Sequence, residues 1–249
     1  MKFNKLAIAS LLTSVTLFAG AHGTHWGYEG HSGAGDWGDL SPKYGICKKG
    51  KNQSPINIVT SKVEHSNHQD KIHFNYVTAG TEIVNNGHTI QVNVDAGSSI
   101  TVHGKEYLLK QFHFHTPSEN QINGKNFPLE AHFVHVSKDN QLAVVGVLFE
   151  DGVDNPELRY IWEKMPHKAH REAPIFFSAE HINNILPKKR DYYKFTGSLT
   201  TPPCSENVKW MVMKNYATIS GPEVREFLHT LHFENNRPVQ EINSRVISD

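Results

Sequence analysis

The sequence has no excess of charge of either sign. Its 249 residues include 25 Lys or Arg and 25 Asp or Glu, so the formal charge is zero with histidine counted as neutral. No run of basic residues is longer than Lys188-Lys189-Arg190. Proteins that bind nucleic acids normally concentrate positive charge to displace counterions from phosphates. The composition therefore argues against a nucleic-acid partner.

The sequence also lacks a hydrophobic run long enough to span a membrane. The uncharged, mainly apolar stretch from Leu6 to Phe18 has 13 residues, whereas a membrane span needs roughly 20. Two lysines precede this stretch, and the small residues Ala19-Gly20-Ala21 follow it. This arrangement is typical of a secretory signal peptide. We therefore expect residues 1–21 to be removed and residues 22–249 to act in the periplasm or outside the cell, without membrane insertion.

Cysteine is scarce, with only Cys47 and Cys204 in the chain. Both lie in the part that is expected to be exported, where an oxidising compartment favours a disulfide. Two free buried thiols are the alternative, because the sequence cannot show whether the two Cα atoms come within bonding distance.

No linker rich in Pro, Ser or Gly divides the chain, and we find neither an internal repeat nor a low-complexity tract. Hydrophobic residues make up 38% of the sequence and aromatic residues 10%, which is enough to form a core. The chain is therefore expected to form a single globular domain.

Short runs that alternate apolar and polar residues dominate the chain beyond the signal segment. Such alternation is typical of β-strands, because successive side chains point to opposite faces. The runs occur at 89–94, 100–102, 107–115, 129–136, 142–149 and 209–214. Helical signals are fewer and predict short helices from 155 to about 164, from 178 to just before Pro187, and from 221 to about 231. We expect a mainly β domain with a large, mostly antiparallel sheet and short peripheral helices.

The most informative histidines lie in Phe112-His113-Phe114-His115, because on a strand both imidazoles would project to one face and both phenyl rings to the other. Further along, Glu130 and His132 share one face of a second run and Phe133 takes the other, with a turn predicted at Asn123-Gly124-Lys125. If the two runs are antiparallel neighbours, three imidazoles converge. Three neutral histidines that bind Zn²⁺ leave a fourth tetrahedral position open, which is typical of a catalytic site.

The residues beside these histidines strengthen the metal hypothesis. Gln111 precedes His113 by two positions, and Glu130 precedes His132 by two, so each shares a face with an imidazole. Metal-bound imidazoles are usually oriented by such neighbours. The alternative is that these are sheet histidines with ordinary hydrogen-bond partners and no metal.

Beyond the metal motif, the chain resembles α-class carbonic anhydrases, of the exported bacterial type, over nearly its whole mature length. The family's signatures occur in the family's order. They are Trp26-Gly27-Tyr28, Gln53-Ser54-Pro55-Ile56-Asn57-Ile58, Asn85-Asn86-Gly87-His88, Gln111-Phe112-His113-Phe114-His115, Glu130-Ala131-His132-Phe133-Val134-His135, Gly197-Ser198-Leu199-Thr200-Thr201-Pro202-Pro203 and Asn236-Arg237-Pro238-Val239-Gln240.

This resemblance implies zinc-dependent, reversible hydration of carbon dioxide to bicarbonate, with one zinc ion per chain, attack by a zinc hydroxide and a histidine proton shuttle. The zinc ligands it implies are His113, His115 and His132, and the residues that orient them are Gln111, Glu130 and the main-chain carbonyl of Asn235. Thr200, held by Glu119, would orient the zinc-bound water, and His88 occupies the shuttle position.

The resemblance also implies the surroundings of the site. Carbon dioxide would lie against Val134, Val144, Leu199, Thr201 and Trp210, whose apolar members form a dry wall. The polar side, which orders the proton path, would be lined by Tyr28, Asn86, Gln91 and again Thr201.

For the fold, the resemblance implies a twisted, mostly antiparallel sheet of about ten strands. It also implies cis peptide bonds at Ser54-Pro55 and Pro202-Pro203, and a disulfide between Cys47 and Cys204. A monomer and a homodimer both remain open. The chain departs from many animal members at Phe195, where they carry Tyr.

Two other functions compete with this one. The spacing His113-x-His115-x3-Glu119 fits the first metal motif of cupins, but the glycines of that motif are replaced by Tyr107 and Asn126. The other alternative is a noncatalytic periplasmic zinc-binding protein on the same fold, which would bind metal without hydrating carbon dioxide.

Overall fold

The computed structural model describes residues 24–65 and 71–249. The predicted signal peptide, residues 1–21, lies outside the described residues. The helices are α1 (Trp37–Leu40), α2 (Ile46–Lys49), α3 (Pro156–Trp162), α4 (Ala179–Ile185) and α5 (Gly221–Leu231), with 3-10 turns η1 (Gly30–Ser32), η2 (Pro42–Tyr44) and η3 (Thr60–Lys62). The strands are β1 (Asn57–Ile58), β2 (His73–Asn75), β3 (Gly80–Asn85), β4 (Ile90–Val94), β5 (Ser99–Val102), β6 (Lys105–His115), β7 (Gln121–Ile122), β8 (Leu129–Ser137), β9 (Leu142–Asp151), β10 (Arg171–Phe177), β11 (Tyr192–Ser198), β12 (Glu206–Met213) and β13 (Ala217–Ile219).

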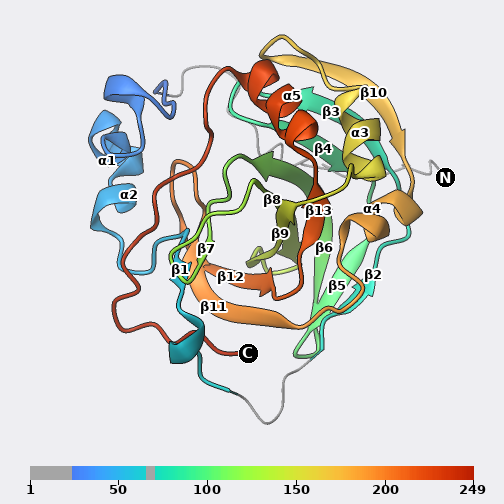
Figure 1. Ribbon diagram of the computed structural model, residues 1–249. Coiled ribbons are helices and arrows are strands. Elements are labelled where there is room, and N and C mark those ends of the chain that lie inside the picture. Colours follow the sequence, from blue (N-terminus) through green and yellow to red (C-terminus); the bar gives the residue numbers. More distant parts are fainter. Residues whose placement is uncertain (1–23, 66–70) are drawn as a thin grey trace, which may run out of the picture.

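One mixed sheet of 11 strands organises the described part of the chain, and its main order is β10-β3-β4-β6-β8-β9-β12-β11. Strand β5 pairs with β6 and β2, and β13 pairs with β9. The pairings of β9 with β12 and β13 are parallel, whereas the others in this sheet are antiparallel. Figure 1 shows a strongly curved sheet with β6, β8 and β9 near the middle, α3, α4 and α5 along one side, and α1 and α2 at the other.

The predicted fold class is confirmed, since the chain is mainly β with one large, mostly antiparallel sheet and short helices. All of the predicted strand runs overlap observed strands, and the predicted helices correspond to α3, α4 and α5. The cis bonds at Ser54-Pro55 and Pro202-Pro203 are present, and a third at Thr116-Pro117 was not predicted. Strands β1, β2, β3, β7, β10, β11 and β13 also overlap none of the predicted runs.

Alternation along β6 explains how the sheet divides its two faces. Phe112 and Phe114 are fully buried on one face. Phe112 lies 5.2 Å from the ring of Phe133 on β8, and Phe114 lies 5.0 Å from Trp162 of α3. Burial of each such side chain contributes about 1.5–3 kcal/mol. The phenyl rings thus anchor the helix-covered face and turn the intervening histidines to the other face.

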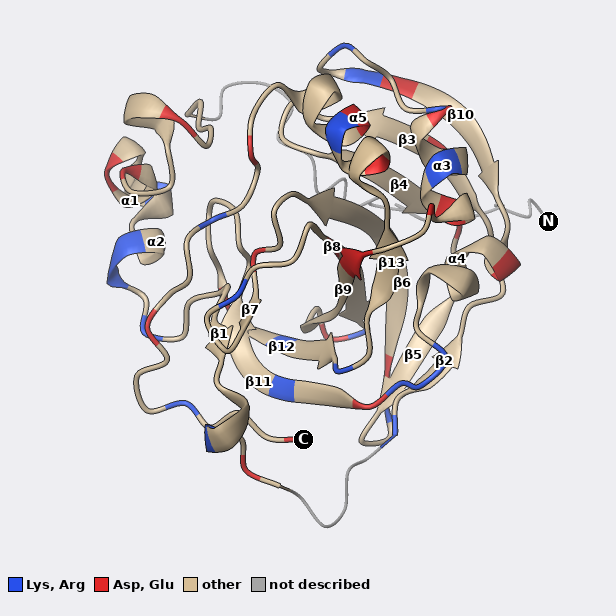
Figure 2. Ribbon diagram, viewed as in Figure 1, with Lys and Arg blue, Asp and Glu red and all other residues tan. Residues whose placement is uncertain are grey.

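Charged residues do not gather into a patch of one sign on the ribbon. Figure 2 shows Lys and Arg interspersed with Asp and Glu over the strands, helices and loops. Within residues 24–65 and 71–249, no helix combines the length and hydrophobicity that crossing a bilayer requires.

Candidate metal centre

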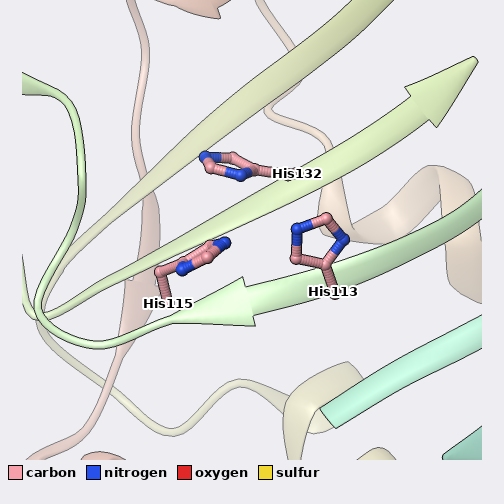
Figure 3. A group of neighbouring side chains, drawn as sticks. All are labelled: His113, His115 and His132. Carbon is pink, nitrogen blue, oxygen red and sulfur yellow. The ribbon is translucent and has the colours of Figure 1, made fainter. Parts of the chain in front are cut away.

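Strands β6 and β8 are antiparallel neighbours, as the metal hypothesis required. His113 lies directly opposite His132 across this pair, and His115 lies opposite Glu130. Because residues two apart on a strand share a face, all three imidazoles project from one side of the sheet. Figure 3 shows the rings of His113 and His115 on one strand turned toward the ring of His132 on the next.

One nitrogen atom from each imidazole faces a shared space. These three atoms lie within 4.8 Å of one another. The buried His115 Nε2 has no hydrogen-bond partner among the described residues, an arrangement that is costly unless a ligand satisfies the nitrogen. The donor set fits Zn²⁺, which is bound by three imidazoles in catalytic sites and then keeps one coordination position open.

Two of the imidazoles are fixed through their other nitrogen. His113 Nδ1 lies 2.8 Å from Gln111 Oε1, and His115 Nδ1 lies 2.7 Å from the main-chain carbonyl oxygen of Asn235. Since both oxygens only accept, each Nδ1 must donate its proton. The Nε2 lone pairs are then free to bind a metal.

The third imidazole is oriented by Glu130. Its Oε1 lies 3.0 Å from His132 Nε2, although the angles depart from those of a full hydrogen bond. Asn120 fixes Glu130, because its backbone and side-chain N–H groups donate to the carboxylate at 2.8 and 2.7 Å. A Cβ at Gly146, opposite His132 on β9, would lie only 2.9 Å from Glu130 Oε1. Glycine therefore leaves room for this carboxylate.

Burial keeps the three imidazoles neutral. It lowers the pKa of His115 to about 4, although the hydrogen bond to Asn235 opposes the shift. Burial, followed by repulsion from the neighbouring imidazoles, also lowers the pKa values of His113 and His132 well below the ordinary value. Neutral imidazole is the form that binds metal, so the cluster is ready to bind one near neutral pH.

A buried carboxylate, Glu119, lies beside the histidines. Its Oε2 is 3.6 Å from His115 Nε2 and 3.9 Å from His132 Nδ1, while its Oε1 accepts a 2.8 Å hydrogen bond from the backbone N–H of Arg237. Burial raises the pKa of Glu119 well above its usual value, and hydrogen bonding from the Thr200 side chain is the largest opposing effect. Oε2 has no partner of strict hydrogen-bond geometry, but Thr200 is close enough to favour the charged form.

The loop that carries Thr200 follows β11 and is held at several points. The predicted disulfide is present, with Cys47 Sγ and Cys204 Sγ 2.12 Å apart. Gln53 Nε2 donates to the carbonyl oxygen of Cys204 at 3.0 Å, and Trp210 Nε1 donates to that of Ser198 at 2.9 Å. The Thr200 side chain, in a residue only 5% exposed, is thus presented from a fixed backbone.

An apolar row lies beside the histidines on the same face of the sheet. Val134 on β8 is directly opposite Val144 on β9, which in turn is paired with Trp210 on β12. Val134 lies two residues beyond His132 on its strand, and the Trp210 ring is 4.9 Å from the His132 ring. Leu199 packs against the same cluster. These are the residues that the resemblance assigned to the carbon dioxide wall, and the fold brings them together.

The wall also accommodates one departure from the family pattern. Phe195 on β11 lies opposite Trp210 on β12, and the two rings stack with centroids 6.0 Å apart. The Phe195 side chain therefore supports the wall by ring packing.

The predicted shuttle residue His88 follows the turn at Asn86-Gly87 and is half-buried. Its ring stacks on that of Trp26, with centroids 3.8 Å apart and planes 7° from parallel. Its carbonyl oxygen accepts a hydrogen bond from Asn235 Nδ2 at 3.0 Å, which connects this turn to the residue that orients His115. Burial, aided by repulsion from neighbouring histidines, lowers the pKa of His88 to about 4.

The other predicted proton-path residues take different places. Asn86 Oδ1 accepts 2.9 Å hydrogen bonds from the backbone N–H groups of His88 and Thr89 and so shapes the turn. Gln91 is buried on β4 directly opposite His113. Burial raises the pKa of Tyr28 well above its usual value, and the charge of Glu119 acts in the same direction.

Thr201, half-buried beside Thr200, accepts a hydrogen bond at its carbonyl oxygen from the backbone N–H of Cys204 at 2.9 Å. The two predicted roles of its side chain, beside the substrate and on the proton path, stay predictions.

Sequence reasoning assigned no role to Trp26, Asn120, Gly146 or Arg237. The Arg237 side chain is almost wholly buried and donates to Gln53 Oε1 and to the carbonyl oxygens of Ser54 and Cys47. Its position next to Asn236 in a recognised motif was a signal, but its contacts join segments far apart in sequence. Such contacts leave no periodic pattern.

Fold and site together define a class of protein. A curved β-sheet holds three imidazoles from two adjacent strands next to an apolar wall, as in zinc enzymes whose metal keeps an open position.

Residues 32–249 match the family model described as eukaryotic-type carbonic anhydrase. The chain is 46% identical over 247 residues to the carbonic anhydrase of Neisseria gonorrhoeae, covering 98% of this chain and 96% of the relative. It is 41% identical to that of Pectobacterium carotovorum, covering 98% of each. The solved α-carbonic anhydrase of Thermovibrio ammonificans, in complex with sulfanilamide, superposes with a TM-score of 0.87 at 44% identity, covering 92% of this chain and 100% of that one.

The chain therefore belongs to the eukaryotic-type, or α, carbonic anhydrase family and is an enzyme of that family. This result favours the family resemblance over the cupin alternative.

Proposed function

We propose that this chain catalyses the reversible hydration of carbon dioxide to bicarbonate and a proton, with one Zn²⁺ held by His113, His115 and His132. The observation that carries the proposal is the pairing register of the strands. The three imidazoles face one another from β6 and β8. The apolar row of Val134, Val144 and Trp210 begins two residues beyond His132 on the same face of the sheet.

The histidines suit zinc in their number, their neutral form and the orientation of their outer nitrogens. Zinc, when bound, supplies a Lewis acid that lowers the pKa of a coordinated water to about 7, a value established for carbonic anhydrases as a class. Gln111, Asn235 and Glu130 hold the imidazoles so that little reorganisation accompanies metal binding.

Thr200 and Glu119 orient the reacting water. Charged Glu119 can only accept, so the Thr200 hydroxyl donates to it and keeps its own lone pairs for a proton of the water. The water is then fixed with a lone pair directed at the carbon atom of the substrate. A Zn²⁺ held by the three histidines would stabilise the charged form of Glu119 that this arrangement needs, and the charge of Arg237 acts in the same direction.

Carbon dioxide is small and apolar, so it binds where water is excluded. Val134, Val144, Leu199 and Trp210 supply such a surface within reach of the oriented water. Thr201 adjoins it on the polar side, where Tyr28, Asn86 and Gln91 order the path by which the proton leaves toward His88.

We further propose that residues 1–21 are a cleaved signal peptide and that residues 22–249 act in the periplasm or outside the cell. The disulfide between Cys47 and Cys204 supports an oxidising compartment, because such bonds are rare where thiols are kept reduced.

The test is carbon dioxide hydration followed by stopped flow with a pH indicator, on mature protein before and after treatment with a chelator. Activity that is lost with zinc and returns with it is the expected result. Tight binding of one zinc per chain with no hydration above the buffer rate would instead indicate the noncatalytic zinc-binding protein.

A further inference from the structure

A second imidazole, that of His170, packs against the turn that carries His88. Gly87 has a φ of +85°, and a Cβ placed there would lie 2.7 Å from His170 Cε1 and 3.1 Å from His170 Nε2. The His170 ring therefore occupies the space that a side chain at position 87 would fill. Gly87 directly precedes His88, which is the residue expected to receive the proton.

The position of His170 is set by two contacts of its own segment. Asn85 Nδ2, in β3, donates to the carbonyl oxygen of Pro166 at 2.9 Å. Arg171, the residue after His170, is paired with Asn85 across β10 and β3. The segment is thus tied to the His88 turn on both sides of His170. His170 itself has a φ of +59°, a left-handed conformation that is uncommon for residues other than glycine.

His88 has limited exposure to the solvent. Its half-buried ring is stacked on Trp26, which fixes the plane in which its two nitrogens lie. Burial lowers the pKa of His88 to about 4, and the charges of His170 and His25 act in the same direction. His170 and His25 are the titratable groups whose charges act on it. A proton that reaches His88 is therefore released readily to a nearby base.

We propose that His170 is the outer proton acceptor of this enzyme, receiving the proton from His88 and passing it to buffer. The step moves one proton and no electrons. An N–H bond of the His88 imidazolium breaks, an N–H bond forms on the neutral His170 ring, directly or through a water, and a buffer base then removes that proton. His170 is exposed, as this last transfer requires. The inference rests on the proposed function, in which His88 is the inner shuttle.

His170→Asn tests the role with little disturbance, because Asn tolerates the left-handed backbone but carries no titratable ring. The matched control is His167→Asn, an exposed histidine of the same segment whose Nδ1 contacts Thr230 Oγ1 instead. In dilute buffer we expect His170→Asn to lower kcat on the order of tenfold with kcat/KM unchanged, since proton release affects kcat alone. Added imidazole should restore kcat, and the control should match the native enzyme.

A titration of the histidine C–H signals by NMR supplies a readout that is independent of turnover. Loss of the His170 charge should raise the pKa of His88, whereas His167→Asn should leave it unchanged. The inference is overturned if kcat of His170→Asn in dilute buffer equals that of the native enzyme while kcat of His88→Ala is lowered. In that case, kcat of His25→Asn shows whether His25 is the acceptor instead. If His88→Ala is not slowed either, the histidine shuttle of the proposed function fails, and the inference fails with it.

Discussion

Removal of the disulfide should destabilise this protein far more than it slows the reaction. The bond joins Cys47 and Cys204, which are 157 positions apart. In the chain-entropy model, a closed loop of that length adds about 5 kcal/mol to the free energy of unfolding at 25 °C. Native disulfides contribute about 2–5 kcal/mol when measured. We therefore expect the double variant Cys47→Ser/Cys204→Ser to lose an amount in that range.

The catalytic rate should be less sensitive, because the Thr200 loop keeps its other anchors. The hydrogen bonds from Gln53 to Cys204 and from Trp210 to Ser198 use main-chain oxygens, which the substitution leaves in place. Below its unfolding temperature, the variant should lose less than about tenfold in hydration rate, which corresponds to about 1.4 kcal/mol in the barrier.

Urea unfolding followed by tryptophan fluorescence measures the first quantity, and stopped-flow hydration at 25 °C measures the second. The native protein treated with a reductant serves as a control with an unchanged sequence. A loss of stability below about 1 kcal/mol would refute the chain-entropy argument for this loop. A hundredfold loss of rate in a stable variant would show that the disulfide, and not the hydrogen bonds, positions Thr200.

Three further changes test separate parts of the site and core. Thr200→Ala removes the group that orients the water, so hydration should fall about a hundredfold while zinc content, measured by atomic absorption, stays at one per chain; unchanged turnover would refute the role. Gln111→Ala removes the acceptor that fixes His113, so zinc affinity in competition with a chelator should fall by about 10–100-fold, and native affinity would contradict the contact's importance. Burial lowers the pKa of His135 to about 3, whereas the ordinary value is about 6.5. Between these two pH values the unfolded chain binds more protons than the folded chain. The free energy of unfolding therefore falls by up to about 1.4 kcal/mol per pH unit as the pH drops from about 6.5 towards 3. His135→Gln should flatten that dependence in urea titrations between about pH 7 and 4, and an identical slope would show that His135 is not responsible.

Much of the sheet could be predicted because its strands alternate. The run through Phe112-His113-Phe114-His115 has an apolar face and a polar face, and the period of two places each side chain correctly. Strand β10 escaped prediction because it lies at the edge of the sheet and contains Pro174 beside an irregularity in the pairing. Edge strands tolerate proline and have little alternation to detect.

The parallel pairing of β9 with β12 could not be predicted from local patterns. Val144 and Trp210 are neighbours across that pair, yet more than 60 residues separate them in the chain. Their place in the apolar wall was therefore known only through the family resemblance.

The candidate site likewise contains some residues that the spacing predicted and others that it could not predict. Offsets of two residues along a strand predicted Gln111 beside His113 and Glu130 beside His132. The carbonyl of Asn235 could not be found from side-chain chemistry, since any residue has that group, and it came from the resemblance alone. The stacking of Trp26 on His88 joins a loop to a distant turn and has no signal in the sequence.

The central claim is that one zinc ion held by His113, His115 and His132 makes this chain a carbon dioxide hydratase. The most direct test is a titration of zinc into metal-free mature protein with the hydration rate recorded at each addition. The rate should rise linearly and stop rising at one equivalent per chain, and His115→Ala should show no such rise. A rate that stays at the buffer value through several bound equivalents, or a native-like titration in His115→Ala, would contradict the account.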